Sequence, residues 1–510
     1  MDGQFDAIVV GGGVGGTYAA WRLMTGQVSP GSPIPQNPSD RRVALFELSD
    51  RIGGRLESLV PPGMENLRAE FGGMGYTSND TLLNELVALF SLPFEPFPHG
   101  GPNNLFYLRG VQFTVAKASD PSFAPPYQLE PADKGVDPRT LVPNTIEKVF
   151  PGCSTWTQEQ WNQATSKPFK GRSLNDLGFW NFLELNMTNE ELSYARDSYG
   201  HFFEVANWNC AQALPWFMLD GNATYSTLTD GYDQLPLTLA AAFAKAGGQT
   251  FMSTPVASVQ QVTIGPQGAT TMEVAAASGQ TCTATAVVLA LPRRALELLD
   301  AQVLEEPTAR QLVASVTGQP VMKVFCCYEQ PWWNELGITA GSSATDLPLG
   351  QVWYFGPDSG SNPNSLLLAT YNDTLNPTYW EGLSSGPRFP TEDGGGAVDP
   401  HWAAQAPSAF MVGEIQRQLA VVHPTPVPDP YSAAWMDWSG DPYGGAFNTW
   451  NVGVDVDNVA TSILQPDPSV PLYVCGEAYS HDQGWVEGAL DTGEQVVELL
   501  GVTQPAFRSS

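Results

Sequence analysis

A glycine-rich turn close to the first residue most constrains how this chain can fold. Gly11, Gly13 and Gly16 follow a β-branched run at residues 5–10 and open a stretch, residues 14–24, with apolar residues at helical spacing. Between a strand and a helix, the first glycine allows the tight turn, the second lets a pyrophosphate approach, and the third lets the helix pack on the strand. The free N–H groups at the start of such a helix bind phosphate oxygens. The pattern predicts a dinucleotide-binding unit, and a glycine turn without a ligand is the alternative.

A second strand at residues 41–48 extends this unit and ends near an acidic side chain. Glu47 stands where a carboxylate can accept hydrogen bonds from an adenosine ribose. It lies further from Gly16 than the usual spacing of about 20 residues, and the proline-rich stretch 26–40 accounts for the excess. A glutamate that merely faces solvent is the alternative.

Two further segments suit a flavin dinucleotide better than a nicotinamide. Arg51 and Arg55 flank Gly53 and Gly54, which favours a second approach to the pyrophosphate by charge-assisted hydrogen bonds. Residues 472–500 predict a strand, a Gly-Glu pair, a Gly-Trp loop and a helix. The positive end of that helix would face an anionic ring.

The 510 residues are too many for one hydrophobic core, so we expect two or three domains. Residues from about 140 to 224 have helical periodicity, and Thr188 with Glu191 predicts a capped helix start. Residues 319–329 predict a long strand that holds Lys323. Residues 340–365 and 375–408, rich in Gly, Pro, Ser and Asp, predict loops.

Charge and cysteine content exclude several classes of function. With 53 acidic against 23 basic residues, the formal charge is −30, which disfavours nucleic acid and anionic membranes as partners. The six cysteines are scattered, so we expect neither a metal site nor a disulfide framework. The start of the chain has no secretory pattern and no apolar run long enough to span a membrane. We therefore expect a cytoplasmic protein.

Blocks along nearly the whole chain occur in the order of one enzyme family. The chain resembles the flavin-dependent amine oxidase superfamily, and most of all its L-amino-acid oxidase branch. The resemblance is carried by GGGVGG, FELSDRIGGR, FGGMGY, DGYDQLP, VVLALPRRAL, PVMKVF, PYGGAFNTW and the terminal GEAYS and GWVEGALDTGE.

The resemblance implies an α/β (α+β) fold in which an FAD-binding Rossmann-like domain is interleaved with a mixed-sheet substrate domain and a helical subdomain. The FAD-binding domain would comprise residues 1–76, 225–298 and 445–505. The substrate-binding domain would comprise residues 77–139 and 299–444, and the helical subdomain residues 140–224.

FAD is the cofactor that the resemblance implies, and its binding residues carry over by motif. They are Gly11, Gly13, Val14, Gly15, Gly16, Glu47, Leu48, Gly53, Gly54, Arg55, Gly72, Gly73, Met74, Val256, Gly476, Glu477, Gly484, Trp485, Val486 and Ala489. Where monoamine oxidases have a cysteine bonded to the flavin, this chain has Ala446. The resemblance therefore implies that FAD is held without a covalent bond.

The resemblance also implies roles at the reacting centre. Lys323 matches the lysine that holds a water against flavin N5, although a lysine at a sheet edge would have no such role. Phe447 and Trp485 match an aromatic cage for the substrate amine, and the Gly484 carbonyl would accept from that amine. Tyr354 would bind a substrate carboxylate, and Trp216 would line the pocket. For each aromatic residue, packing in a core is the alternative.

The implied function is oxidative deamination of L-amino acids to 2-oxo acids, ammonia and hydrogen peroxide, with dioxygen as acceptor. The small-molecule substrate would give a hydride to flavin N5, and the protein could form a homodimer. Many amino-acid oxidases have a carboxylate-binding arginine where this chain has Gly75. An oxidase of primary amines or polyamines that lack a carboxylate, and a flavin-binding protein without oxidase turnover, therefore stay open.

Overall fold

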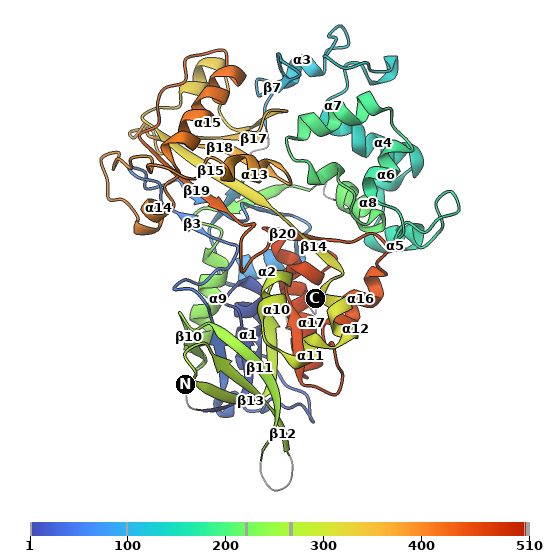
Figure 1. The fold of residues 1–510 in the computed structure, drawn as a ribbon, viewed down its shortest axis with the longest axis vertical. Helices are drawn as coiled ribbons and strands as arrows, with labels where there is room; N and C mark the ends of the chain where they lie inside the picture. Colours follow the sequence, from blue (N-terminus) through green and yellow to red (C-terminus); the bar gives the residue numbers. More distant parts are fainter. Residues whose placement is uncertain (1–2, 98–99, 220–222, 265–268, 504, 506–510) are drawn as a thin grey trace.

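The computed structural model describes residues 3–97, 100–219, 223–264, 269–503 and 505. The predicted domains also include the stretches between these ranges, which lie outside the described residues. Figure 1 shows three parts: a sheet with flanking helices below, a second sheet at the upper left and a group of helices at the upper right.

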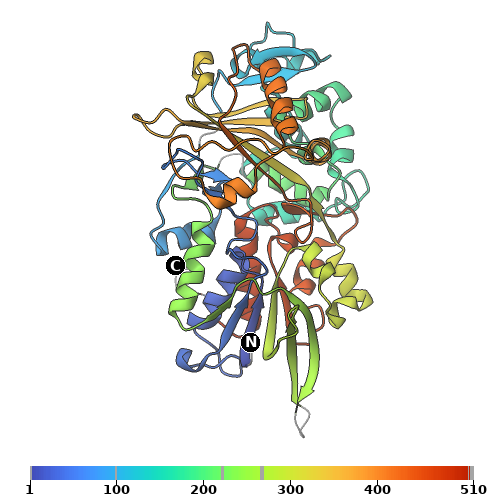
Figure 2. The ribbon, with the colours of Figure 1, turned by 60° about the vertical axis from the view of Figure 1, so that its left-hand side comes forward.

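The first sheet has a parallel core and an antiparallel extension. The parallel strands are β10 (Gln249–Phe251), β2 (Val43–Phe46), β1 (Gln4–Val10), β13 (Thr281–Ala290) and β21 (Leu472–Cys475). β12 (Ala269–Ala276) and β11 (Val256–Ile264) continue the sheet from β13 in antiparallel pairing. In Figure 2 this extension, coloured green, projects from the lower end of the molecule. Three distant parts of the sequence therefore share one sheet.

Helices α1 (Val14–Thr25), α9 (Gln234–Lys245) and α17 (Val486–Leu499) lie together beside this sheet. Apolar residues of β1, β2 and β13 form one core with those of α1 and α17. The predicted strand–turn–helix at residues 5–24 and the strand at 41–48 are confirmed as β1, α1 and β2.

The second sheet is almost entirely antiparallel. Its order is β19 (Ser432–Asp437), β15 (Val321–Tyr328), β18 (Ser365–Asp373), β17 (Gln351–Pro357), β16 (Gly341–Thr345), β7 (Leu105–Leu108) and β8 (Val111–Thr114). Only β16 and β7 pair in parallel within this sheet. Every residue of β15 is buried, and α15 (Ala409–Val422) packs in the same core.

The prediction of loops over 340–365 and 375–408 is wrong in part. Residues 341–357 hold β16 and β17. The Ser and Thr residues of β16 resemble a loop sequence, and β17 alternates between partly buried and buried positions over residues 351–355. Residues 376–404 include the short helices α13 (Asn376–Glu381) and α14 (Pro400–Ala404), each beginning with a proline in its first turn.

The third part contains α4 (Leu141–Val149), α5 (Gln158–Thr165), α6 (Phe179–Glu184), α7 (Asn189–Tyr199) and α8 (Cys210–Leu219), which enclose their own apolar core. The predicted cap of α7 is confirmed: the Thr188 side chain accepts from the Glu191 backbone N–H, and Glu191 accepts from the Thr188 N–H.

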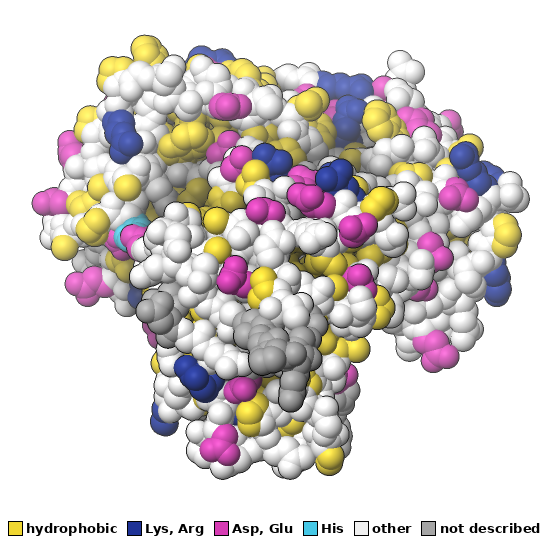
Figure 3. Space-filling model, turned by 60° about the horizontal axis from the view of Figure 1, so that its bottom comes forward, with side chains coloured by type: hydrophobic (Ala, Val, Ile, Leu, Met, Phe, Trp, Pro, Cys, Tyr) yellow, Lys and Arg dark blue, Asp and Glu magenta, His cyan; other side chains and the backbone are white. Residues whose placement is uncertain are grey.

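Short elements connect these parts. They are β3 (Ser58–Leu59), β4 (Ala69–Glu70), β5 (Tyr76–Thr77), α2 (Thr81–Leu89), β6 (Phe94–Pro96), α3 (Val115–Ala118), β9 (Tyr225–Leu228), α10 (Arg293–Leu298), α11 (Gln302–Glu305), α12 (Pro307–Val313), β14 (Val316–Gln319), β20 (Phe447–Trp450) and α16 (Val456–Ile463). None of the helices in the described ranges is long and apolar enough to cross a membrane. On the face in Figure 3, acidic and basic side chains lie interspersed among uncharged ones.

Candidate functional site

A cavity of about 700 Å³ lies where the three parts of the molecule meet. Its wall includes the turn before α1, the end of β2, the loop between β4 and β5, the start of α17, and residues of β17, β18 and the helical part. A cavity of this size accommodates a cofactor or a drug-sized ligand.

The glycine turn at one end of the cavity has the geometry that its sequence predicts. Gly11 has a φ of +107°, a conformation that favours glycine. A Cβ on Gly16 would lie 1.9 Å from the Gly11 carbonyl oxygen, so only glycine lets α1 pack this closely. Gly16 does not line the cavity, whereas Gly11, Gly13, Val14 and Gly15 do. Among the described residues no side chain caps the first turn of α1, which leaves its N–H groups available to an anion.

A second helix start faces the same cavity. Trp485 precedes the first residue of α17, and no side chain caps this helix either. Gly476, Glu477, Gly484, Trp485, Val486 and Ala489 all line the cavity. Two helix N-termini therefore present partial positive charge to one space, as a negatively charged ligand requires.

A buried ion pair fixes these two helices against each other. Arg22 of α1 lies 2.9 Å from the Glu494 carboxylate of α17, and the Tyr18 hydroxyl donates to the same carboxylate at 2.7 Å. The helices approach closely, because a Cβ on Gly15 would lie 2.9 Å from the Ala489 carbonyl oxygen.

Glu47 lies in the cavity wall with both carboxylate oxygens oriented. One oxygen accepts from the Gly12 N–H at 2.7 Å, and the other from the Ser49 N–H and hydroxyl. The oxygen bonded to Gly12 accepts only this one hydrogen bond and can accept a further one, which suits the predicted ribose contact. Leu48 and Val256 line the same end of the cavity.

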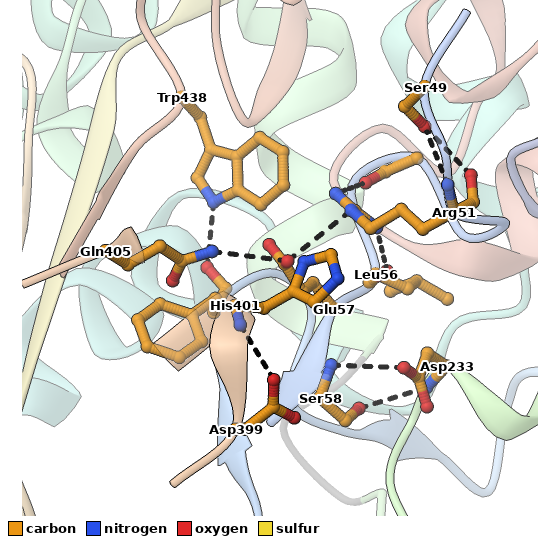
Figure 4. Close-up of polar contacts among 12 residues, drawn as sticks. Ser49, Arg51, Leu56, Glu57, Ser58, Asp233, Asp399, His401, Gln405 and Trp438 are labelled. Atoms are coloured by element: carbon orange, nitrogen blue, oxygen red, sulfur yellow. Dashed lines mark hydrogen bonds and ion pairs between the residues drawn. The ribbon is translucent and has the colours of Figure 1, made fainter. Parts of the chain in front are cut away.

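The two arginines of the predicted pyrophosphate clamp have different surroundings. Arg55 lines the cavity, and its Nη1 donates to the Glu477 carboxylate at 2.8 Å and to the Ala446 carbonyl. Its other guanidinium N–H groups make no hydrogen bond within the described residues. Arg51 is turned away from the cavity, so its predicted phosphate contact is wrong. Figure 4 shows it directed at Leu56 and Glu57, where it holds the loop that carries Gly53 and Gly54.

Glu477 is the centre of a hydrogen-bond network at the start of α17. Its carboxylate accepts from Arg55, from the Asn448 N–H at 2.7 Å and amide group, and from the Gly484 N–H at 3.1 Å. This single side chain therefore joins the arginine, strand β20 and the Gly-Trp loop into one rigid wall.

The loop between β4 and β5 lies along the cavity, with Gly72, Gly73, Met74 and Gly75 in the wall. Glycine is required in this loop because neighbouring backbone atoms leave no room for a Cβ. A Cβ on Gly72 would lie 1.7 Å from the Arg55 carbonyl oxygen, and one on Gly75 would lie 2.8 Å from that of Ser226. A side chain at Gly75 therefore requires the loop or β9 to move.

Lys323 of β15 lies behind this loop and does not line the cavity. Its Nζ donates to the carbonyl oxygens of Glu70 and Gly72, and lies over the Tyr371 ring at 4.7 Å. Burial lowers the pKa of Lys323 to about 7, although the nearby Glu70 carboxyl opposes this shift. Burial likewise raises the pKa of Glu70 to about 8. The expected role of Lys323 near flavin N5 stays a prediction.

The end of the cavity away from the glycine turn is aromatic. Phe447, Trp485 and Trp216 line it as predicted, with the Gly484 backbone beside them. The Phe203 ring lies 4.8 Å from that of Phe447 and 5.6 Å from that of Trp216, both edge to face.

The predicted substrate contact of Tyr354 is wrong. Tyr354 is buried, and its hydroxyl bonds to the Ser343 hydroxyl at 2.7 Å and the His423 ring at 2.6 Å, outside the cavity wall. The neighbouring Trp353 lines the cavity instead. Successive residues of β17 point to opposite faces of the sheet, so the prediction chose the right strand and the wrong face.

Sequence reasoning missed several residues of the aromatic end, namely Phe97, His201, Phe203, Glu204, Trp208, Tyr225, Gln351, Trp353 and Tyr371. Of these, only Glu204 carried a signal in the sequence, because it interrupts the aromatic run at residues 202–208 with a charge.

The residues of the cavity fit FAD. Glycines leave room along the first turn of α1. The uncapped start of α1 and the N–H groups of Arg55 that have no partner among the described residues suit a pyrophosphate, the uncapped start of α17 suits an anionic ring, and Glu47 suits a ribose. No cysteine of the described residues lines the cavity, so no thiol is placed to bond to a flavin. Nor do the described residues contain a His, Cys, Asp and Glu cluster suited to a metal ion.

Comparisons with known proteins agree with this geometry. The family model of flavin containing amine oxidoreductases matches residues 16–500. Aplysianin-A of Aplysia kurodai is 25% identical over 98% of this chain and 90% of its own. A putative L-amino-acid oxidase of Bacillus subtilis (strain 168) is 20% identical over 96% of this chain and 93% of its own. The solved structure of cyclohexylamine oxidase from Brevibacterium oxydans has a TM-score of 0.68 and 18% identity, and the match covers 98% of both chains.

Proposed function

Because the chain belongs to the family of flavin containing amine oxidoreductases, we propose that it is an FAD-dependent oxidase of primary amines without a carboxylate on the reacting carbon. Charge at the substrate end carries this proposal. Among the described residues, Arg55 is the only lysine or arginine that lines the cavity, and Glu477 holds it at the cofactor end. A substrate carboxylate would lose its hydration there without gaining a charged partner.

The residues of the chain bind and orient the amine. Phe447 and Trp485 offer ring faces to its nitrogen and keep water from the reacting carbon. When bound, FAD supplies the acceptor for the α-carbon hydride and passes the electrons to dioxygen, giving hydrogen peroxide. Water then hydrolyses the resulting imine to ammonia and a carbonyl compound.

The test is hydrogen peroxide release from FAD-loaded protein with a panel of simple amines and all common L-amino acids. The proposal predicts turnover of alkyl or aryl amines and little turnover of the amino acids with the same side chain. Turnover of amino acids alone would overturn it, and so would purified protein that takes up no flavin.

L-amino-acid oxidation is the second candidate, favoured by the name of the Bacillus subtilis relative. It requires neutral groups to hold the carboxylate. The Tyr371 hydroxyl, which makes no hydrogen bond within the described residues, lines the cavity where it could donate. Tyr371→Phe separates the two candidates, since only amino-acid oxidation needs this donor. The expected loss would appear as an increased KM for amino acids and not for amines.

We further propose that Lys323 assists reoxidation of the reduced flavin by dioxygen. Its Nζ lies behind the loop and donates to the Glu70 and Gly72 carbonyl oxygens, and Gly72 lines the cavity. Lys323→Met should slow reoxidation of the reduced flavin by dioxygen by about a hundredfold or more, the lower end of the range for a lost proton-transfer group. Anaerobic flavin reduction by the amine should change much less. Stopped-flow absorbance separates the two steps, and equal effects on both would contradict the role.

A further inference from the structure

We propose that the substrate carries a second cationic group, remote from the amine that is oxidised, and that the Glu204 carboxylate holds this group. The inference rests on the proposed amine oxidation and specifies the class of amine. Glu204 lies in the wall of the cavity, at its aromatic end.

Glu204 is held in place by a rigid turn. It belongs to the short helical turn Phe203–Val205. The Asp373 carboxylate, at the end of β18, accepts from the backbone N–H groups of Phe202 at 2.7 Å and Phe203 at 3.0 Å. This contact attaches the turn to the second sheet. Because the Phe203 ring packs on Phe447, the same turn sets Glu204 beyond the aromatic cage.

The Glu204 carboxylate lacks the partners that a buried acid ordinarily has. Within the described residues it accepts no hydrogen bond, and its one ion-pair contact is with the His201 ring, 3.8 Å away. Burial lowers the pKa of His201 to about 3, so the ring is uncharged at neutral pH and does not neutralise the acid. The Glu204 side chain is only 16% exposed, so water cannot supply all the hydrogen bonds that its carboxylate oxygens would accept.

The neighbouring charges favour a cation here. Burial, and after it the nearby Asp373 carboxyl, raises the pKa of Glu204 well above its ordinary value, so the protonated acid is favoured until a cation binds and stabilises the carboxylate. Lys323, the single lysine of β15, already donates to two backbone carbonyls behind the loop. A ligand cation would relieve this unfavourable burial by supplying the missing positive charge.

Aromatic rings complete the surroundings of a cation. Phe203, Trp208, Trp216 and Tyr371 line the cavity near this turn, and Trp208 lies 6.1 Å from Trp216 in edge-to-face contact. Ring faces attract ammonium and guanidinium groups more strongly when water is excluded. A carboxylate among aromatic rings is therefore suited to hold the far end of a diamine or an amino-guanidine.

The experiment compares diamines of three to eight carbons with alkylamines of the same length, which have a methyl group in place of the second ammonium. In wild-type protein the best diamine should exceed its alkylamine at least tenfold in kcat/KM. Glu204→Gln, which keeps the shape and removes the charge, should reduce this ratio at least tenfold. Glu381→Gln, at an exposed position outside the cavity, makes the same change in net charge and should leave the ratio unchanged.

Two outcomes separate failure of this inference from failure of the proposed function. Alkylamines oxidised as well as every diamine would overturn the second cation site and leave amine oxidation intact. If FAD-loaded protein oxidises no amine, the proposed function fails. A binding measurement then tests whether Glu204 forms a site for a second cation. Pentamethonium, which has two quaternary ammonium groups and cannot form an imine, should bind at least tenfold more tightly than pentyltrimethylammonium in calorimetry. Equal affinity, or a preference that Glu204→Gln retains, would overturn the site.

Discussion

Two oppositely ionisable side chains lie buried behind the loop between β4 and β5. Glu70 accepts from the Tyr232 N–H at 2.9 Å and from the Ser58 hydroxyl at 2.7 Å, while Lys323 donates to the Glu70 carbonyl. Burial makes the charged form of each group less favourable, so the pKa of Glu70 rises and that of Lys323 falls. The wall of the substrate cavity therefore rests on groups that change protonation near neutral pH.

Glu70 makes the stability of the protein depend on pH. Its pKa rises from 4.5 to about 8 on folding, so between these values the folded state binds a proton that the unfolded state has lost. The contribution of Glu70 to the free energy of unfolding is therefore complete below about pH 4.5 and decreases as the pH rises toward about 8. Lys323, with a folded pKa of about 7, opposes this slope only above neutral pH.

Glu70→Gln should consequently lessen the fall in Tm between about pH 5 and pH 7. Thermal unfolding of the FAD-loaded protein across this range measures the difference. The exposed variant Glu381→Gln is the matched control and should keep the wild-type slope. Parallel curves for wild type and Glu70→Gln would show that Glu70 is already ionised in the folded protein.

At the scale of single residues, the sequence predicted a role correctly where the backbone conformation admits only one type of residue. The glycines before α1 and around Gly53 could be identified because a tight turn and a close approach admit no other residue. Tyr354 was misplaced because its role depended on which face of β17 meets the cavity, and a shift of one residue reverses that face. Tyr371 was missed because only tertiary packing brings it to the cavity, whereas Glu204 was missed although its charge interrupts an aromatic stretch of the sequence.

Among the elements, α1 and α17 determine the cofactor end of the site. Both begin at the cavity without a side-chain cap, and the buried contact of Arg22 with Glu494 fixes their relative position. The helices come from opposite ends of the chain, so this contact holds together two halves of one anion site. We expect their alignment to matter for FAD retention as much as for stability.

Glu494→Gln should cost about 3 to 5 kcal/mol of unfolding free energy, because it leaves the Arg22 charge buried without its partner. Urea unfolding measures the cost, and flavin absorbance after gel filtration measures the FAD retained. Glu297→Gln provides the comparison, since its pair with Arg293 is partly exposed and should contribute no more than about 1 kcal/mol. Similar costs for the two variants would contradict a structural role for the buried pair.

At the scale of the whole molecule, the cavity belongs to no single part. Its wall combines the first sheet, the second sheet and the helical part. The general architecture could be predicted because the family motifs occur in order along the sequence. The strands β16 and β17 could not, because the Ser and Thr residues of β16 and the Gly and Pro that end β17 resemble a loop sequence until neighbouring strands bury them.

Removing FAD should therefore destabilise all three parts together. Free FAD at one hundred times its Kd should stabilise the folded protein by about 2.7 kcal/mol over the cofactor-free form. Differential scanning calorimetry should show one transition that moves upward as FAD is added. Riboflavin, which lacks the pyrophosphate and adenosine, should move it much less. A transition insensitive to FAD would contradict binding in this cavity.

The strand order of the first sheet also determines when a newly synthesised chain can complete its cofactor site. β21 pairs with β13 only after residues 472–475 have been synthesised, and α17 follows it. A nascent chain that already contains the glycine turn, Glu47 and Arg55 still lacks one of the two helix starts that face the cavity. Cofactor capture is therefore completed only after residues 472–499 have been synthesised, and polypeptides truncated before β21 should be released without flavin.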